Sequence, residues 1–229
     1  MKRLIGKYAL VTGGSSGIGA AIADALAGEG AAVVATGRRF TSVALTKPEF
    51  GVVQKINLDV TDEAGVRALI QAMPELDILV CSAGTGTFGP IVNAQTAMLR
   101  EMLDTHIVGT FLCAREALKR MQPRRKGHIV AIASVAANKA FTDCSGYTAA
   151  KAGQLGLVRV LAEEARPYDV RVTSVLPGAT DTPIWDDRPG FDRSKMMKPD
   201  DVAGFVVSII ARPAIAVEEV SINPPGGAL

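Results

Sequence analysis

Thr12-Gly13-Gly14-Ser15-Ser16-Gly17-Ile18-Gly19 is the most informative stretch of this sequence, because it joins an apolar run, Tyr8–Thr12, to a segment of helical period, Gly17–Gly28. Glycines in such a turn let the backbone approach a ligand closely, and the amides that start the helix favour phosphate charge. The spacing Gly-x-x-x-Gly-x-Gly differs from the Gly-x-Gly-x-x-Gly fingerprint, so the stretch alone leaves an ordinary tight turn open. The turn residues that we expect at a ligand are Gly13, Ser15, Ser16, Gly17, Ile18 and Gly19.

Apolar runs of strand length alternate with helix-period segments along the whole chain. This alternation predicts a doubly wound, Rossmann-type α/β fold: one domain, residues 1–229, with a mostly parallel seven-stranded sheet and helices on both faces. The predicted strands are Tyr8–Thr12, Ala32–Thr36, Val52–Ile56, Ile78–Cys81, His128–Ala133, Arg171–Leu176 and Val217–Ile222. The predicted helices are Gly17–Gly28, Thr61–Ala72, a long one within Thr96–Met121, Gly146–Ala165 and Asp200–Ala211. The stretch from Arg39 to Val52 has little amphipathic period and receives no assignment.

The composition argues against several classes of protein. The 229 residues are 48% hydrophobic, which suffices for one large core. A formal charge of +2, with no basic cluster beyond Arg124-Arg125-Lys126, argues against a nucleic-acid partner. No apolar run approaches the ~20 residues of a membrane span, and the amino terminus lacks an apolar signal segment. Cys81, Cys113 and Cys144 lie far apart without metal-ligand spacing, so we expect no metal, no membrane association and a soluble, cytoplasmic protein.

The second predicted strand ends in Thr36-Gly37-Arg38-Arg39. In dinucleotide-binding folds a carboxylate at this place binds a ribose hydroxyl of the adenosine and selects NAD. Here Gly37 takes the acidic position, while the guanidinium groups of Arg38 and Arg39 offer charge and forked donors to a 2′-phosphate. The sequence therefore predicts NADP(H) as the preferred cofactor, with NAD(H) possible. Plain surface charge is the alternative interpretation of the two arginines.

A second group of polar residues lies in the later half of the chain. Tyr147 and Lys151 stand four residues apart in a predicted helix, so the phenol and the ammonium share one face. Ser134 follows a predicted strand thirteen residues before Tyr147. A cation beside a phenol lowers the pKa of the phenol, and a hydroxyl can polarise a carbonyl oxygen. These residue types suit proton transfer to a carbonyl during hydride transfer, whereas the tyrosine–lysine spacing without Ser134 and the glycine turn would better fit a helix surface.

The motif series resembles that of the short-chain dehydrogenase/reductase family. It consists of Thr12–Gly19, Asp59-Val60, Ser82-Ala83-Gly84, Ser134, Tyr147-x-x-x-Lys151 and Pro177-Gly178, and it covers almost the whole chain. The resemblance implies an NAD(P)-dependent oxidoreductase of one domain, acting on a small carbonyl or alcohol substrate and forming a homodimer or homotetramer. The resemblance implies that Tyr147 is the acid/base and also contacts the cofactor, that Ser134 polarises the substrate oxygen, and that Lys151 tunes the phenol and binds the nicotinamide ribose.

The same resemblance implies positions for further cofactor contacts. Asp59 and Val60 would flank the adenine, although Asp59 could also cap the following helix. Ala83 and Gly84 would lie along the cofactor. Past the sixth strand, the implied contacts are Pro177, Gly178, Thr180 and Thr182, of which Thr182 would meet the carboxamide. Pro177-Gly178 could also be a simple turn.

Two positions depart from the family pattern. Cys81-Ser82 stands where the family commonly has Asn-Asn, and His106 stands where a helix asparagine completes a catalytic tetrad. An imidazole can relay protons near neutral pH, so His106 is a candidate catalytic residue with an altered pH profile. Alternatively, His106 is a packed polar residue in a weakened or inactive member. The competing hypothesis is therefore a non-catalytic dinucleotide-binding regulator or interaction protein.

The segment Pro177–Pro199 is the one long stretch rich in Pro, Asp and Arg, and it is a natural substrate lid. It contains Trp185, Phe191, Met196 and Met197, which suit a small apolar or mixed carbonyl compound but could equally pack the segment down. The identity of the substrate does not follow from these residues.

Overall fold

The computed structural model describes residues 2–188 and 190–227 as one domain. Four residues lie outside the described ones. They are Met1, Ala228 and Leu229 of the predicted domain and Pro189 of the predicted lid. The strands are β1 (Tyr8–Thr12), β2 (Ala32–Thr36), β3 (Val53–Ile56), β4 (Ile78–Cys81), β5 (Gly127–Ile132), β6 (Val170–Pro177) and β7 (Glu219–Ile222). The helices are α1 (Gly17–Gly28), α2 (Glu63–Ala72), α3 (Thr96–Leu103), α4 (Gly109–Met121), α5 (Ser145–Ala165) and α6 (Pro199–Ile210).

The seven strands form one sheet in the order β3-β2-β1-β4-β5-β6-β7, and every neighbouring pair is parallel. The predicted doubly wound α/β fold is therefore confirmed. The strand order reverses between β1 and β4, which lie side by side although β2 and β3 separate them in the chain. A crevice opens at such a reversal, beyond the carboxyl ends of the strands.

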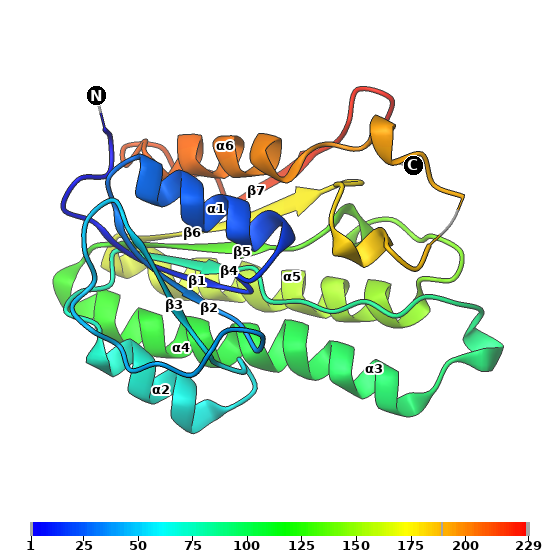
Figure 1. The fold of residues 1–229 in the computed structure, drawn as a ribbon, viewed down its shortest axis with the longest axis horizontal. Coiled ribbons are helices and arrows are strands. Elements are labelled where there is room, and N and C mark those ends of the chain that lie inside the picture. Colours follow the sequence, from blue (N-terminus) through cyan, green and yellow to red (C-terminus); the bar gives the residue numbers. More distant parts are fainter. Residues whose placement is uncertain (1, 189, 228–229) are drawn as a thin grey trace.

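Helices cover both faces of the sheet (Figure 1). On one face α1 and α6 pack together over a cluster that includes Ile22, Leu26 and Val206. On the other face α2, α4 and α5 enclose a second cluster with Leu69, Leu112 and Leu161. The central strands are thus buried from both sides, which is why their sequences are continuously apolar rather than alternating.

Side-chain capping explains where α2 begins. The predicted helix starts at Thr61, but the structure starts it at Glu63 because Asp62 is the N-cap and accepts a hydrogen bond from the Gly65 amide at 3.1 Å. Asp59 also accepts hydrogen bonds, at 2.9 and 2.8 Å, from the amide and the hydroxyl of Thr61. Two consecutive polar turns therefore hold the chain out of the helix until Glu63.

The predicted long helix within Thr96–Met121 is interrupted by a π-helical turn. This turn, η2 (Asp104–Val108), lies between α3 and α4 and carries the buried His106. The extra residue of a π turn rotates the side chains that follow it, and such turns frequently occur at functional sites.

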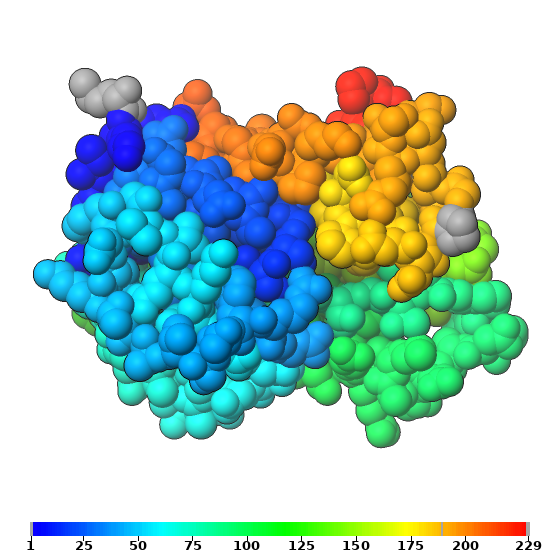
Figure 2. Space-filling view, viewed as in Figure 1, coloured from blue at the N-terminus to red at the C-terminus, as the bar shows by residue number. Residues whose placement is uncertain are grey.

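The stretch left unassigned between β2 and β3 contains no helix in the structure, since residues 41–49 have no regular hydrogen bonding. The segment 177–199 is irregular and contains two short 3₁₀ turns, Pro183–Trp185 and Arg193–Lys195. In Figure 2 its yellow and orange residues border blue residues of the early part of the chain. None of the described helices has the length and apolar character needed to cross a bilayer.

Candidate active site

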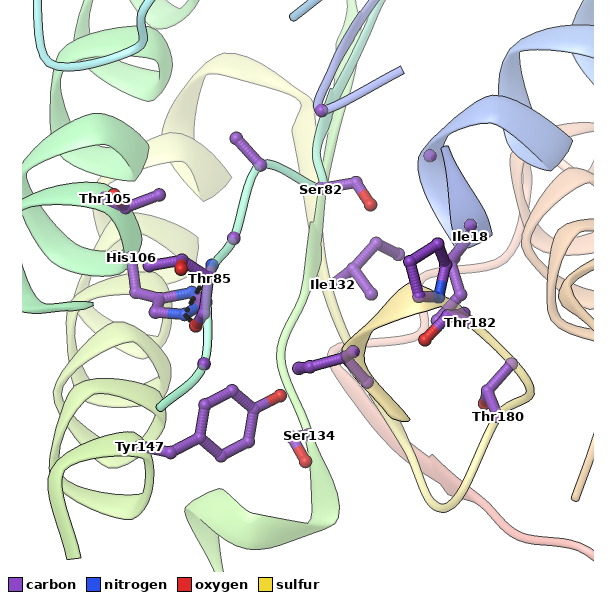
Figure 3. Close-up of a pocket in the computed structure, with 18 of the residues that line it drawn as sticks. Ile18, Ser82, Thr85, Thr105, His106, Ile132, Ser134, Tyr147, Thr180 and Thr182 are labelled. Carbon is purple, nitrogen blue, oxygen red and sulfur yellow. Dashed lines mark hydrogen bonds between the residues drawn. The ribbon is translucent and has the colours of Figure 1, made fainter. Parts of the chain in front are cut away.

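A cavity of about 720 Å³ lies at the carboxyl ends of the central strands, at the place where the strand order reverses. It is lined by the first strand–helix turn, the ends of β4 and β5, the start of α5 and the segment after β6. Figure 3 shows how these elements converge. Parallel strands all deliver their carboxyl ends to this edge, so residues far apart in the sequence meet here.

Nearly every residue predicted for the site lines this cavity. Those from the cofactor prediction are Gly13, Ser15, Ser16, Gly17, Ile18, Gly19, Arg38, Arg39, Asp59, Val60, Ala83, Gly84, Gly178, Thr180 and Thr182. Those from the catalytic prediction are His106, Ser134, Tyr147 and Lys151. Pro177 is the exception: it is the last, buried residue of β6 and lies opposite Ile222 of β7, so it belongs to the sheet and not to the cavity wall.

The first turn has the shape of a phosphate cradle. Gly13 has φ +69°, and a Cβ there would lie 2.6 Å from the backbone of Ala83, so only glycine allows β1 and β4 to approach this closely. Ser16, the N-cap of α1, makes no side-chain capping bond. The first amides of α1 thus face the cavity without a side chain competing for them. The residues present therefore fit a dinucleotide pyrophosphate.

The two arginines after β2 have different partners. Arg39 Nη2 donates hydrogen bonds to the hydroxyls of Ser16 at 2.5 Å and Ser15 at 3.3 Å. Arg38 forms only a 3.6 Å ion pair with Glu101, in which both side chains are more than half exposed. Such an exposed pair contributes little energy, so Arg38 is available for a stronger anion at the cavity edge.

Asp59 lines the cavity and shapes the turn before α2, but the N-cap of that helix is Asp62, so Asp59 is not the cap that the alternative interpretation expected. Burial alone would raise the pKa of this carboxyl, but the two hydrogen bonds from Thr61 and the charge of Arg38 bring it below its usual value. The side chain is therefore an anion at neutral pH.

Tyr147 is held between two rings. Its ring centre lies 5.3 Å from that of Phe88 and 5.7 Å from that of His106, which meets it edge-on. Burial raises the pKa of the phenol to about 12, while the neighbouring Ser134 hydroxyl and the charge of Arg188 oppose the rise. This direction is opposite to the lowering expected from the sequence, because desolvation outweighs the nearby positive charge.

Lys151 is almost completely buried at the base of the cavity. Its Nζ donates to the Ile132 carbonyl at 2.9 Å and to Gln154 Oε1 at 3.1 Å, and it lies 5.8 Å from the centre of the Tyr147 ring. Gln154 is fixed in turn by donating to Thr110 Oγ1 at 2.9 Å. Burial lowers the pKa of this lysine to about 7. Its charge therefore changes near neutral pH.

Ser134 follows β5 and is the N-cap of the short turn Val135–Ala137. Its Oγ accepts a hydrogen bond from the Ala136 amide at 3.1 Å. The hydroxyl hydrogen is left to donate toward the cavity, where Figure 3 places Ser134 next to Tyr147. The two hydroxyls can thus meet one substrate oxygen.

His106 is buried on the opposite side of Tyr147, where its Nε2 donates to the Thr85 carbonyl at 2.7 Å (Figure 3). A Cβ on Gly84 would lie 2.6 Å from His106 Cε1, so the imidazole packs directly against this glycine. Burial and the charge of Lys151 lower the pKa of the imidazole to about 3. An imidazole with this pKa stays neutral near pH 7, so the arrangement does not favour the proton relay expected from the sequence.

Several residues of the site carry no motif signal. Phe88 and Arg188 line the cavity beside Tyr147, and Gln154 anchors Lys151. Lys151 and Gln154 are three residues apart on one helix, and this spacing could have indicated that Gln154 contacts the lysine. Phe88 and Arg188 come from irregular segments, where no periodicity shows the direction of a side chain. Among the described residues, no group of three His, Cys, Asp or Glu side chains could hold a metal ion.

Comparison with known proteins gives a consistent family. Residues 7–190 match the family model described as short chain dehydrogenase. An uncharacterized oxidoreductase of Staphylococcus haemolyticus is 32% identical over 98% of this chain and 100% of its own length. The 2-dehydro-3-deoxy-L-rhamnonate dehydrogenase (NAD(+)) of a Sphingomonas species is 34% identical over 82% of this chain and 77% of its own. The solved structure of an alcohol dehydrogenase from Thermococcus sibiricus, complexed with 5-hydroxy-NADP, is 25% identical with a TM-score of 0.82, and the match covers 96% of this chain and 97% of that one.

Proposed function

The chain belongs to the short-chain dehydrogenase/reductase family, and from this premise we propose that it is an NADP(H)-dependent oxidoreductase of small carbonyl and alcohol substrates with Tyr147 as the acid/base. The observation that carries the proposal is the meeting of Tyr147, Ser134 and Lys151 at one cavity whose other end is a phosphate cradle. The family assignment favours an enzyme over the non-catalytic regulator.

The bound nicotinamide would supply the hydride for carbonyl reduction or accept it in alcohol oxidation. Ser134 donates a hydrogen bond to the substrate oxygen as negative charge develops there. Tyr147, protonated because its pKa is about 12, donates the phenolic proton to the same oxygen. Lys151 uses two of its N–H groups on Ile132 and Gln154, which leaves the third to bind the cofactor ribose and to stabilise the phenolate.

The direct test is NADPH consumption by the purified protein over a panel of ketones, aldehydes, diketones and quinones. We expect oxidation of NADPH with at least one of these classes, and loss of that activity in Tyr147→Phe. Tight NADPH binding without turnover on any compound would contradict the proposal and support the regulator.

Arg38 provides the test of cofactor choice. Because its guanidinium has only a weak, exposed partner, it can pair with a 2′-phosphate, and we expect Arg38→Ala to lower kcat/KM for NADPH by about 10- to 100-fold, as for loss of a charged hydrogen bond. The value for NADH should stay within about threefold. Arg67→Ala, which removes another exposed arginine, paired with Glu63, is the matched control. An unchanged NADPH/NADH preference would contradict the 2′-phosphate assignment.

His106→Asn tests whether the imidazole exchanges protons. Because the pKa of His106 is about 3, we expect the pH–rate profiles of the variant and the wild type to have limbs at the same pH between about 5 and 9. The height of the profile should fall by less than about tenfold, since asparagine can still donate to the Thr85 carbonyl. A limb near pH 6–7 that disappears in the variant would restore the proton relay.

A further inference from the structure

The segment 177–199 places a cation inside the cavity, one ring away from Tyr147. The guanidinium carbon of Arg188 lies 3.9 Å from the ring centre of Phe88, 4.7 Å from that of Trp185 and 4.9 Å from that of Phe191. Phe88 is the ring that also packs on Tyr147. Arg188 and Trp185 both belong to the cavity wall, so this aromatic cluster faces the place where a substrate would meet the phenol.

Arg188 differs from the other cations of this segment in its partners. Each of the others forms an ion pair with an aspartate of the same segment. The pairs are Arg193 with Asp181 at 2.6 Å and with Asp186 at 2.8 Å, Lys195 with Asp192 at 3.7 Å, and Lys198 with Asp181 at 2.9 Å. Within residues 2–188 and 190–227, no carboxylate forms an ion pair with Arg188. This holds also for the carboxylate of the adjacent Asp187.

A side-chain hydrogen bond joins the Arg188 guanidinium to the Cys144 thiol, and the remaining N–H donors of the guanidinium are left for another group. Aromatic rings stack against the flat faces of a guanidinium, whereas its N–H donors point outward in the plane. That planar fork matches the two oxygens of a carboxylate. A partly buried cation without a counter-ion is also unfavourable, and an anion in the cavity would offset this cost.

The charge of the cavity is consistent with an anionic guest at this end. The one carboxylate among the described residues of the wall is Asp59, which lies at the nucleotide end and is bonded to Thr61. Around Tyr147 the wall carries Arg188 and Lys151 instead. An acidic group on the substrate would therefore meet positive potential without facing a carboxylate of the protein.

We propose that Arg188 binds a carboxylate of the substrate, so that the enzyme acts on small oxo acids and the corresponding hydroxy acids in preference to neutral ketones and alcohols. This inference rests on the proposed reductase function and adds the chemical class of its substrate. The three aromatic rings hold the guanidinium in place before the substrate arrives, which reduces the entropy lost on binding.

The kinetic test compares acids with their neutral esters. Pyruvate, acetoacetate and levulinate are each assayed with NADPH against their methyl esters, at fixed ionic strength. We expect a higher kcat/KM for at least one acid than for its ester. In Arg188→Gln the value for that acid should fall about 10- to 100-fold, while the value for the ester stays within about threefold. Arg188→Lys should retain part of the preference because it keeps the charge but not the fork.

Lys195→Gln is the matched control, since it removes the same charge from the same segment at a residue whose side chain is 70% exposed and does not line the cavity. It should leave kcat/KM for the acid and for the ester unchanged.

A second measurement, of fluorescence, does not need turnover. Trp185 is the only tryptophan of the chain and stacks on Arg188, so levulinate should change the intrinsic fluorescence in a saturable way. Methyl levulinate, or levulinate with Arg188→Gln, should not.

The outcomes separate this inference from the proposed function. If kcat/KM falls equally for acid and ester in Arg188→Gln, Arg188 has only a structural role and the inference is overturned. The proposed reductase activity would still stand. Absence of turnover with every compound, combined with an Arg188-dependent fluorescence response to levulinate, would overturn the proposed reductase and keep the carboxylate site. A wild-type protein with neither an acid preference nor that response has no carboxylate site at Arg188.

Discussion

Tyr147→Phe should lower kcat for carbonyl reduction by about 10³-fold or more, while the affinity for NADPH changes less than about threefold. The change removes only the phenolic oxygen, and the ring can keep its packing against Phe88 and His106. The proton donor to the substrate oxygen is lost, and His106 does not replace it, because its imidazole is neutral with Nε2 bonded to Thr85. The measurement is single-turnover NADPH oxidation together with a binding titration by NADPH fluorescence.

Tyr168→Phe is the control for this experiment, since Tyr168 is an exposed tyrosine that does not line the cavity. It should behave as the wild type.

The raised pKa of Tyr147 also determines how the rates of reduction and oxidation depend on pH. Reduction needs the phenol, which persists at every working pH below about 12, whereas alcohol oxidation needs the phenolate and should accelerate as the pH rises. Retention of more than a tenth of kcat in Tyr147→Phe would remove this residue from the acid/base role.

Lys151→Met should lower kcat/KM for NADPH-dependent reduction by about 10²- to 10³-fold. The methionine fills a similar volume, but it removes the ammonium 5.8 Å from the Tyr147 ring and the donor that would hold the cofactor ribose. It also leaves the Ile132 carbonyl and Gln154 without a buried donor, so thermal unfolding has to be measured beside the kinetics. Lys139→Met, at an exposed lysine outside the cavity wall, controls for loss of one positive charge.

The pH profile distinguishes a role of Lys151 in the reaction from a role in folding. Burial lowers its pKa to about 7, while His106 titrates near 3 and Tyr147 near 12, so Lys151 is the group around the phenol that changes charge near neutral pH. The ammonium stabilises negative charge at the phenol, and it forms as the pH falls. The reduction rate of the wild type should therefore rise as the pH falls through about 7, and this limb should vanish in Lys151→Met. A variant that keeps the limb would assign it to another group.

The sequence alone determined the order of the strands and helices, because apolar periodicity is a local property that survives without tertiary contacts. Each predicted strand is present within about two residues of its expected bounds, and the turn at Gly13 and Gly17 has the positive φ values that glycine permits. The spacing of Tyr147 and Lys151 also holds, because helix geometry fixes the relation of residues four apart.

Other features arose only when the chain was folded. The pKa directions of Tyr147, Lys151 and His106 depend on desolvation by segments distant in the sequence, which no spacing reveals. Pro177 was placed at the cofactor, but the last pairing of β6 with β7 draws it into the sheet.

The sequence assigns Arg188 to the 177–199 segment but does not show where its side chain points. Irregular backbone has no period from which the orientation of a side chain follows. Its position against Phe88 depends on the return of that segment over the ends of β4 and β5, a long-range contact. Local sequence thus fixed which elements form and which motif residues they carry. The burial and the neighbouring charges that set the chemistry of those residues come from the tertiary structure, because both are sums over atoms that only folding brings together.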